Sequence, residues 1–144
     1  MKIYIGADHL GIEQRDNIIK YLLENEINVI NSVIENSSTD DYTDFAFDVC
    51  EKVVKDNALG VLICGNGVGM SIAANKVKGI RAARVLNTDD AFKAKNHNGA
   101  NVIAISANND INENKKIIDT FILTKFPTEE RYLRRVGKID NYEL

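Results

Sequence analysis

The segment that decides the fold runs from Gly60 to Lys76 and reads GVLICGNGVGMSIAANK. Residues 60–64 are apolar and predict a buried strand, and residues 72–76 suit a helix that follows directly. Glycines alternate in the loop between them, at positions 65, 67 and 69. Glycine lets the backbone approach a ligand closely, and a helix N-terminus behind such a loop favours an anion. The segment therefore predicts a site for a phosphate or an enolate-like oxyanion.

Two nucleotide-binding loops do not fit this spacing. A dinucleotide fingerprint requires its third glycine at position 70, which is Met70, and a mononucleotide loop requires a Gly-Lys-Ser/Thr run, which is missing. A turn that only packs a helix on a sheet remains an alternative. Cys64 stands in front of the expected helix, which favours a reactive thiolate. The alternative for this cysteine is a small buried apolar side chain.

Outward from this segment, short apolar runs alternate with amphipathic stretches. The expected strands are 2–6, 28–34, 60–64, 80–85 and 102–106, and the expected helices lie near 12–25, 45–53, 72–76, 88–95, 117–122 and 128–138. Such alternation is typical of repeated βαβ units. We therefore expect an α/β fold, a Rossmann-like three-layer αβα sandwich with a mostly parallel five-stranded sheet, in a single domain over residues 1–144.

Ligands of parallel sheets gather where the strands end. This rule directs attention to Ala7–His9, to Cys64–Gly69 and to the segment near His97. We expect all three at the same edge of the sheet.

The composition excludes several classes of protein. With 18 basic and 21 acidic residues, the net charge is −3, which argues against a general nucleic-acid binder. Two cysteines are too few for a disulfide framework or a four-ligand zinc site. Thiol and imidazole chemistry must pass through Cys50, Cys64, His9 and His97, and Cys50 falls in an amphipathic stretch that predicts a core position.

The apolar runs are short. All are far below the roughly 20 residues that a membrane-spanning helix needs. The first residues enter a strand pattern rather than a leader pattern. We therefore expect a cytoplasmic protein without a membrane partner.

Five segments, taken together and in order, resemble the type B ribose-5-phosphate isomerases and the related galactose-6-phosphate isomerase subunits. The resemblance covers roughly residues 1–140 and rests on GADHLG at 6–11, DYTDFA at 41–46, ICGNGVGMSIAANK at 63–76 with GIRA at 79–82, HNGANV at 97–102 and RYLRRV at 131–136.

The resemblance implies an aldose–ketose isomerase for a phosphorylated sugar, without a cofactor or a metal. The position of Cys64 is then the base that moves a proton between C1 and C2 through a cis-enediolate. His97 matches the residue that opens the furanose ring, and Asp8 and Asn98 match sugar contacts. The enediolate oxygens are expected against the backbone N–H groups of Gly65, Asn66, Gly67, Val68 and Gly69.

The phosphate end is implied in the same way. His9, Arg131 and Arg135 match residues that grip the phosphate, and the arginines reach over from a neighbouring subunit on the C-terminal helix. This implies a homodimer or tetramer with shared sites. A guanidinium fork suits phosphate oxygens. Without the resemblance, these arginines suggest a solvated helix face and the two histidines ordinary structural residues.

Four residues depart from the family pattern. Asn66 replaces a usual Thr, Asn108 a phosphate-binding Arg, Tyr132 a common His, and Thr43 a common Pro. The thiol and the ring-opening histidine are kept, so substrate choice is what these departures affect. The leading hypothesis is isomerisation of ribose 5-phosphate and ribulose 5-phosphate. The alternatives are a six-carbon substrate such as galactose or allose 6-phosphate, and a non-catalytic sugar-phosphate binding protein.

Overall fold

The computed structural model describes residues 1–144 as five strands and six helices. In chain order these are β1 (Lys2–Ala7), α1 (Ile12–Glu24), β2 (Asn28–Asn31), α2 (Tyr42–Asp56), β3 (Leu59–Cys64), α3 (Val68–Ala74), β4 (Ala82–Arg84), α4 (Thr88–Asn98), β5 (Val102–Ser106), α5 (Ile111–Leu123) and α6 (Glu130–Asp140). The strand order is β2-β1-β3-β5-β4, and every pair is parallel. The expected α/β class is confirmed, with a sheet that is wholly rather than mostly parallel.

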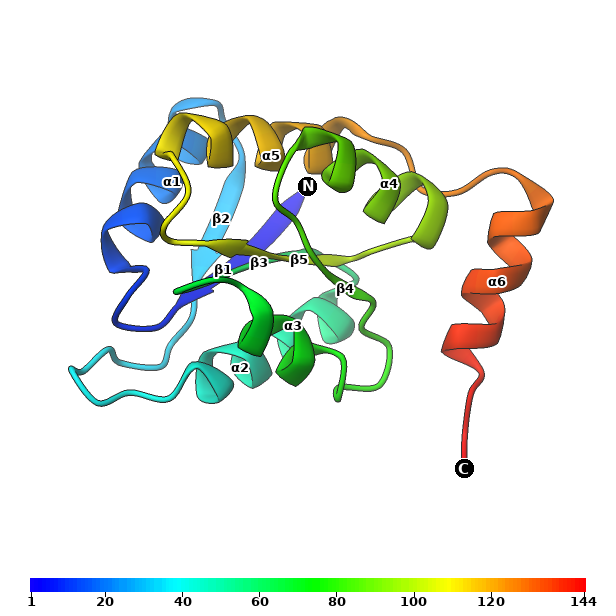
Figure 1. The fold of residues 1–144 in the computed structure, drawn as a ribbon, viewed down its shortest axis with the longest axis horizontal. Helices are drawn as coiled ribbons and strands as arrows, with labels where there is room; N and C mark the ends of the chain where they lie inside the picture. Colours follow the sequence, from blue (N-terminus) through cyan, green and yellow to red (C-terminus); the bar gives the residue numbers. More distant parts are fainter.

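The sheet is covered on both faces. Helices α1, α4 and α5 lie on one face and α2 and α3 on the other (Figure 1). Phe121 of α5 is fully buried against the first of these faces, and Phe45 of α2 is fully buried against the second. Because a sheet covered on both sides excludes water from both, its central strands read as continuous apolar runs. Every residue of β3 is accordingly buried.

Several element boundaries differ from expectation, among them those of β2, α3 and α4. The strand β2 ends at Asn31 rather than at Ile34, because Asp48 of α2 accepts hydrogen bonds from the Ser32 hydroxyl at 2.6 Å and the Val33 N–H at 3.1 Å. The helix α3 begins at Val68, inside the glycine motif. The helix α4 continues to Asn98 and ends at Gly99, whose φ of 60° is a left-handed C-cap.

The last helix, α6, stands apart from the three layers, at the right of Figure 1. It has no buried residue. It corresponds to the helix expected at 128–138, shifted by two residues. None of the six helices has both the length and the apolar character that crossing a membrane demands.

Two glycines offer a matched test of this packing. A Cβ at Gly6 of β1 would lie 2.9 Å from Cγ2 of Val49 on α2, whereas a Cβ at Gly137 of α6 would meet nothing within 4 Å. We predict that Gly6→Ala lowers the free energy of unfolding by about 1–3 kcal/mol through overpacking. Gly137→Ala should leave it unchanged or raise it, by up to about 1 kcal/mol. Urea denaturation of both variants checks this, and equal effects would contradict the packing described.

Candidate active site

The site lies between the carboxyl ends of β1 and β3, which are neighbours in the sheet. From β1 the chain continues to β2 on one side, and from β3 it continues to β4 and β5 on the other side, so this position is the topological switch point of the sheet. The helix after β1 covers one face and the helix after β3 covers the other (Figure 1). A crevice opens at such a switch point. It holds a cavity of about 230 Å³ lined by Asp8, Leu10, Tyr42, Cys64, Gly65, Asn66 and Gly69.

Cys64 is the last residue of β3 and is 5% exposed. Its Sγ accepts a hydrogen bond from the N–H of Gly67 at 3.2 Å. Gly67 has a φ of 81°, and a Cβ there would lie 3.2 Å from the carbonyl oxygen of Ala104, so glycine is required on both counts. An N–H donor aimed at sulfur stabilises the negative charge of a thiolate.

The five N–H groups expected to hold an oxyanion fall into two sets. Those of Gly67 and Val68 are used within the chain, by Cys64 Sγ and by Asn66 Oδ1 at 3.1 Å. Those of Gly65, Asn66 and Gly69 donate to no acceptor within the chain. The Nδ2 group of Asn66 is also unused, because only its Oδ1 is engaged. Three backbone donors and one amide group therefore remain for a ligand.

The carbonyl groups of the loop are held from behind. The Ser106 hydroxyl and Asn108 Nδ2 both donate to the Gly65 oxygen, at 2.7 and 3.0 Å, and Arg84 Nε donates to the Asn66 oxygen at 2.8 Å. Asn108, which replaces the family's phosphate-binding Arg and was expected among the substrate-binding residues, is outside the residues that line the cavity. Its amide fixes the orientation of the glycine loop.

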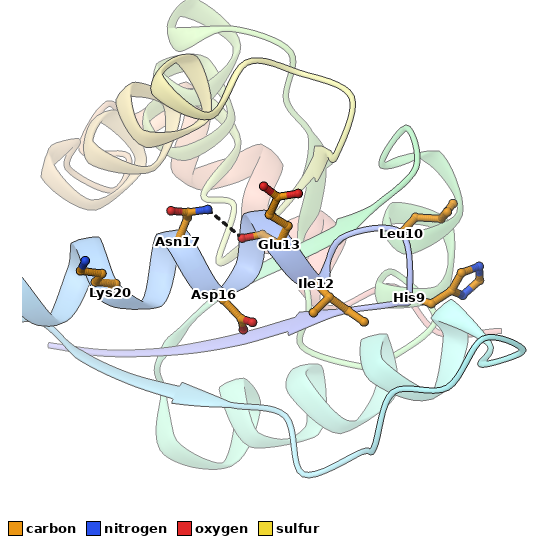
Figure 2. A pocket seen from close by; sticks show the side chains of 7 residues that line it. All are labelled: His9, Leu10, Ile12, Glu13, Asp16, Asn17 and Lys20. Atoms are coloured by element: carbon orange, nitrogen blue, oxygen red, sulfur yellow. Dashed lines mark hydrogen bonds between the residues drawn. The ribbon is translucent and has the colours of Figure 1, made fainter.

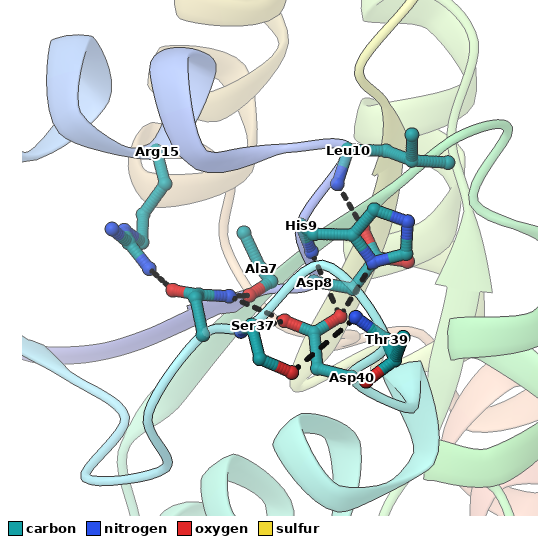
Figure 3. A network of polar contacts seen from close by, with 9 residues as sticks. Ala7, Asp8, His9, Leu10, Arg15, Ser37, Thr39 and Asp40 are labelled. Carbon is teal, nitrogen blue, oxygen red and sulfur yellow. Dashed lines mark hydrogen bonds and ion pairs between the residues drawn. The ribbon is translucent and has the colours of Figure 1, made fainter.

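Asp8 and His9 directly follow β1, and their side chains make different hydrogen bonds. Asp8 is buried, and its Oδ1 accepts the Leu10 N–H at 3.1 Å. Burial raises its pKa above the ordinary value. His9 Nδ1 lies 2.6 Å from Asp40 Oδ1, and the His9 backbone N–H donates to the same oxygen at 3.0 Å (Figure 3).

This ion pair sets the charge of His9. The hydrogen bond to Asp40 raises the pKa of His9. Burial acts to raise the pKa of Asp40, but hydrogen bonds from His9, from Asn36 and from the Ser37 N–H bring it down to about 2. The pairing thus shifts His9 toward the protonated form, with Nε2 free for an anion. Asp8, His9 and Asp40 place polar atoms within 4.8 Å of one another, but Nδ1 of His9 is committed to Asp40.

His97 does not reach this edge of the sheet, so the expectation that it lies with Cys64 is wrong. It belongs to the last turn of α4, which starts beyond the carboxyl end of β4 and runs back. The 11 residues of that helix span about 15 Å. Just after it, Asn101 accepts the Gly60 N–H at the start of β3. His97 therefore lies at the amino edge of the sheet.

Three other predicted residues accompany His97. The His97 ring stacks on Tyr132 of α6, with centroids 4.5 Å apart. Arg131 and Arg135 are exposed on the same helix, and Asn98 directs its amide to the Lys93 carbonyl at 3.2 Å. The structure thus separates the predicted residues into a thiol half-site and a histidine half-site. The thiol half-site comprises Asp8, His9, Cys64, Gly65, Asn66, Gly67, Val68, Gly69 and Asn108, and the histidine half-site comprises His97, Asn98, Arg131 and Arg135.

A second hollow runs along α1 from His9 to Lys20 (Figure 2). The His9 ring points away from the helix in that view. Glu13 and Asp16 contribute acidic side chains to the hollow, and these repel a phosphate. This hollow is therefore less suited to a phosphate than the space on the Cys64 side of His9, even though Lys20 also lines it.

The structure adds three residues that the sequence did not single out. Asp40 orients His9, and Ser106 orients the Gly65 carbonyl. Tyr42 lines the cavity and presses on Gly69, where a Cβ would lie 2.7 Å from Tyr42 Cζ. Only Tyr42 had a signal, since it belongs to the DYTDFA segment.

A parallel α/β protein with a thiol, free N–H donors and an imidazole paired with a carboxylate at its switch point belongs to the class that binds a small anionic ligand. The ribose/galactose isomerase family model matches residues 3–139. The chain belongs to this family, and the expected class, a sugar-phosphate isomerase, is confirmed.

Relatives match over nearly their whole length. A probable ribose-5-phosphate isomerase B of Mycoplasma pneumoniae is 42% identical over 98% of this chain and 94% of that protein. The ribose-5-phosphate isomerase B of Mycobacterium tuberculosis is 34% identical over 99% and 90%. The crystal structure of the Mycoplasma genitalium ribose-5-phosphate isomerase B with bound ribulose-5-phosphate has a TM-score of 0.92 and 41% identity, covering 98% and 95% of the two chains.

The pairing of His9 with Asp40 predicts a measurable titration. In Asp40→Asn the hydrogen bond to a carboxylate is lost, so the pKa of His9 should fall from its raised value toward or below 6.5. Because His9 is positive below its pKa, inorganic phosphate should bind the variant more weakly near pH 7 and nearly normally near pH 5.5. NMR titration of the two histidines, with His97→Gln for assignment, checks this. An unchanged His9 midpoint would contradict the pairing.

Proposed function

We propose that this protein interconverts ribose 5-phosphate and ribulose 5-phosphate through a cis-enediolate, with Cys64 as the base. The observation that supports this most is the cavity at the switch point, where a thiol and unused N–H donors line the same space. The named relatives support the five-carbon substrate.

The proton transfer follows from this arrangement. In the open aldose, the Cys64 thiolate takes the proton from C2, and electrons shift to leave negative charge on the C1 oxygen. The proton of the C2 hydroxyl then passes to the C1 oxygen, which leaves the negative charge on the C2 oxygen. As the thiol returns its proton to C1, the C2 oxygen becomes the ketose carbonyl and Cys64 is again a thiolate. Donors that hold the enediolate oxygens are worth about 3 kcal/mol each in the transition state. We assign this task to the N–H groups of Gly65, Asn66 and Gly69 and to Asn66 Nδ2.

Ring opening requires the histidine half-site, which a single chain holds at the opposite edge of the sheet from Cys64. We infer that a second copy supplies it. Two copies related by a two-fold axis give two equivalent sites, each with a thiol half-site from one copy and a histidine half-site from the other. Helix α6, which buries no residue within its own chain, is the element that reaches across.

In this assembly the phosphate meets the His9 imidazolium from one copy and Arg131 and Arg135 from the other. Arginine forms paired hydrogen bonds with phosphate oxygens. Asn108 does not add a third guanidinium, and its amide is engaged by the Gly65 carbonyl.

Removal of the thiol should abolish turnover. We predict that Cys64→Ala reduces isomerisation of ribose 5-phosphate by about a hundredfold to ten-thousandfold and leaves substrate binding nearly intact. Cys50→Ala is the matched control, because burial raises the pKa of that thiol to about 12 and keeps it neutral. Coupled ketose assays and calorimetry measure both quantities. Turnover retained in Cys64→Ala would remove the thiol from its assigned role.

The same assay on a panel of aldose phosphates tests the substrate. Ribose 5-phosphate should give the highest kcat/KM. A preference for galactose or allose 6-phosphate would favour the six-carbon alternative. Saturable binding without ketose formation on any sugar would identify a binding protein instead.

Shared sites predict complementation. Cys64→Ala and His97→Gln proteins should each be inactive, and a refolded equimolar mixture should regain about a quarter of wild-type activity, because half of the dimers contain one intact site of two. Specific activity across mixing ratios checks this. No recovery at any ratio would contradict a site shared between copies.

A further inference from the structure

We propose that Tyr132 is a positioning residue that holds the His97 imidazole and the Arg131 guanidinium as one preassembled unit. The inference rests on the proposed function, because it concerns how the histidine half-site is ordered before it meets a substrate.

Tyr132 lies between the two groups. Its ring is stacked on His97, with a 4.5 Å centroid separation and an 18° interplanar angle. The Arg131 guanidinium lies 4.7 Å from the Tyr132 centroid, and Arg131 Nη2 donates to the Tyr132 hydroxyl at 3.0 Å. Phe92 adds an edge contact to His97 at 5.9 Å and 75°. These contacts restrict the plane of the imidazole and the direction of the guanidinium together.

The two helices that meet in this stack are also tied together elsewhere. Lys95 of α4 is 3% exposed, and its Nζ donates to the carbonyls of Phe121 and Ile122 at 2.6 and 3.1 Å. Its ammonium lies 5.1 Å from the centroid of Phe126, in the segment that leads from α5 into α6. Carbonyl groups at a helix C-terminus favour a cation. The start of α6 is thereby anchored to the helix that carries His97.

A third contact keeps α6 close to α4. A Cβ at Gly99, the residue that ends α4, would lie 3.3 Å from Cγ2 of Val136. The stack, the Lys95 anchor and this close approach leave α6 little freedom to turn. Of the residues that make these contacts, Tyr132 is the one that touches both His97 and Arg131.

This arrangement has a chemical purpose. Proton transfer to a ring oxygen requires the imidazole nitrogen in line with that oxygen, and a misplacement of about 1 Å costs on the order of a hundredfold in rate. A histidine at position 132 can stack on His97, but it lacks a phenolic hydroxyl for Arg131. Tyr132 therefore links the ring-opening group to the phosphate contact in this chain.

Two reactions distinguish a positioning role of Tyr132 from an effect on the stability of the fold. Ribose 5-phosphate is mostly a closed furanose, so its isomerisation needs ring opening. Ribulose 5-phosphate is acyclic because its C5 oxygen is esterified, so exchange of its C1 proton with solvent deuterium needs only the thiol half-site and a bound phosphate. The variants are Tyr132→Leu, which removes the stack, and Tyr132→Phe, which keeps it and removes the hydroxyl. Tyr142→Leu is the control, since Tyr142 is 73% exposed.

Tyr132→Leu should reduce kcat for ribose 5-phosphate by about tenfold to a hundredfold, while exchange at saturating ribulose 5-phosphate stays within about threefold of wild type. Tyr132→Phe should raise KM for both sugars by about three- to tenfold with kcat nearly unchanged, because only a hydrogen bond to Arg131 is lost. Tyr142→Leu should match wild type. Circular dichroism confirms folding, and if Tyr132→Leu does not fold, the KM-specific effect of Tyr132→Phe decides.

Equal losses in isomerisation and exchange for Tyr132→Leu, or kinetics of both Tyr132 variants that match Tyr142→Leu, would overturn the positioning role. A wild-type protein that performs neither reaction would overturn the proposed function, and this inference with it.

Discussion

A parallel sheet imposes one constraint on which the rest of this molecule depends. All strands point the same way, so each strand ends at the same edge and each connecting helix must return to the opposite one. Cys64 terminates a strand, and His97 lies in the last turn of a returning helix. The two residues with the most chemistry are therefore held at opposite edges of one chain. No change of side-chain conformation can bring them together, because about 15 Å of helix separates the two edges.

The thiol half-site follows from the same geometry. At the switch point the loops after β1 and β3 open on the same crevice, and the start of α3 brings a helix N-terminus behind the thiol. The glycine loop is not free to adjust. Gly67 is confined by the Ala104 carbonyl, and the Gly65 carbonyl is held by two side chains from β5 and its following turn. Donors fixed in this way require little reorganisation when charge develops on a ligand.

Much of the fold was predictable because apolar runs and glycine positions are local signals. The strand at Leu59–Cys64 is buried along its whole length, and the stretch at Ile12–Glu24 repeats apolar residues with helical spacing. The place of His97 was predicted wrongly because its motif was taken as a strand end. A signal was present, since Asn98-Gly99 is a typical helix C-terminus.

The contacts within the site were less predictable. His9 and Asp40 are paired although they lie 31 positions apart in the sequence. A local sequence pattern does not predict a contact between residues so far apart. The stack of His97 on Tyr132 depends on the direction in which α6 extends from the three layers. That direction follows from the Lys95 anchor and not from the composition of α6. The resemblance identified the residues of both half-sites, but their separation within one chain came only from the topology.

We infer that a second copy completes the site that one chain leaves divided. A crystal structure of this protein with an acyclic five-carbon sugar phosphate tests it most directly. We expect the C1–C2 end of the ligand beside Cys64 of one copy, with His97, Arg131 and Arg135 of the other copy within hydrogen-bonding distance of the ligand. A ligand bound at Cys64 with contacts from a single copy alone would contradict it.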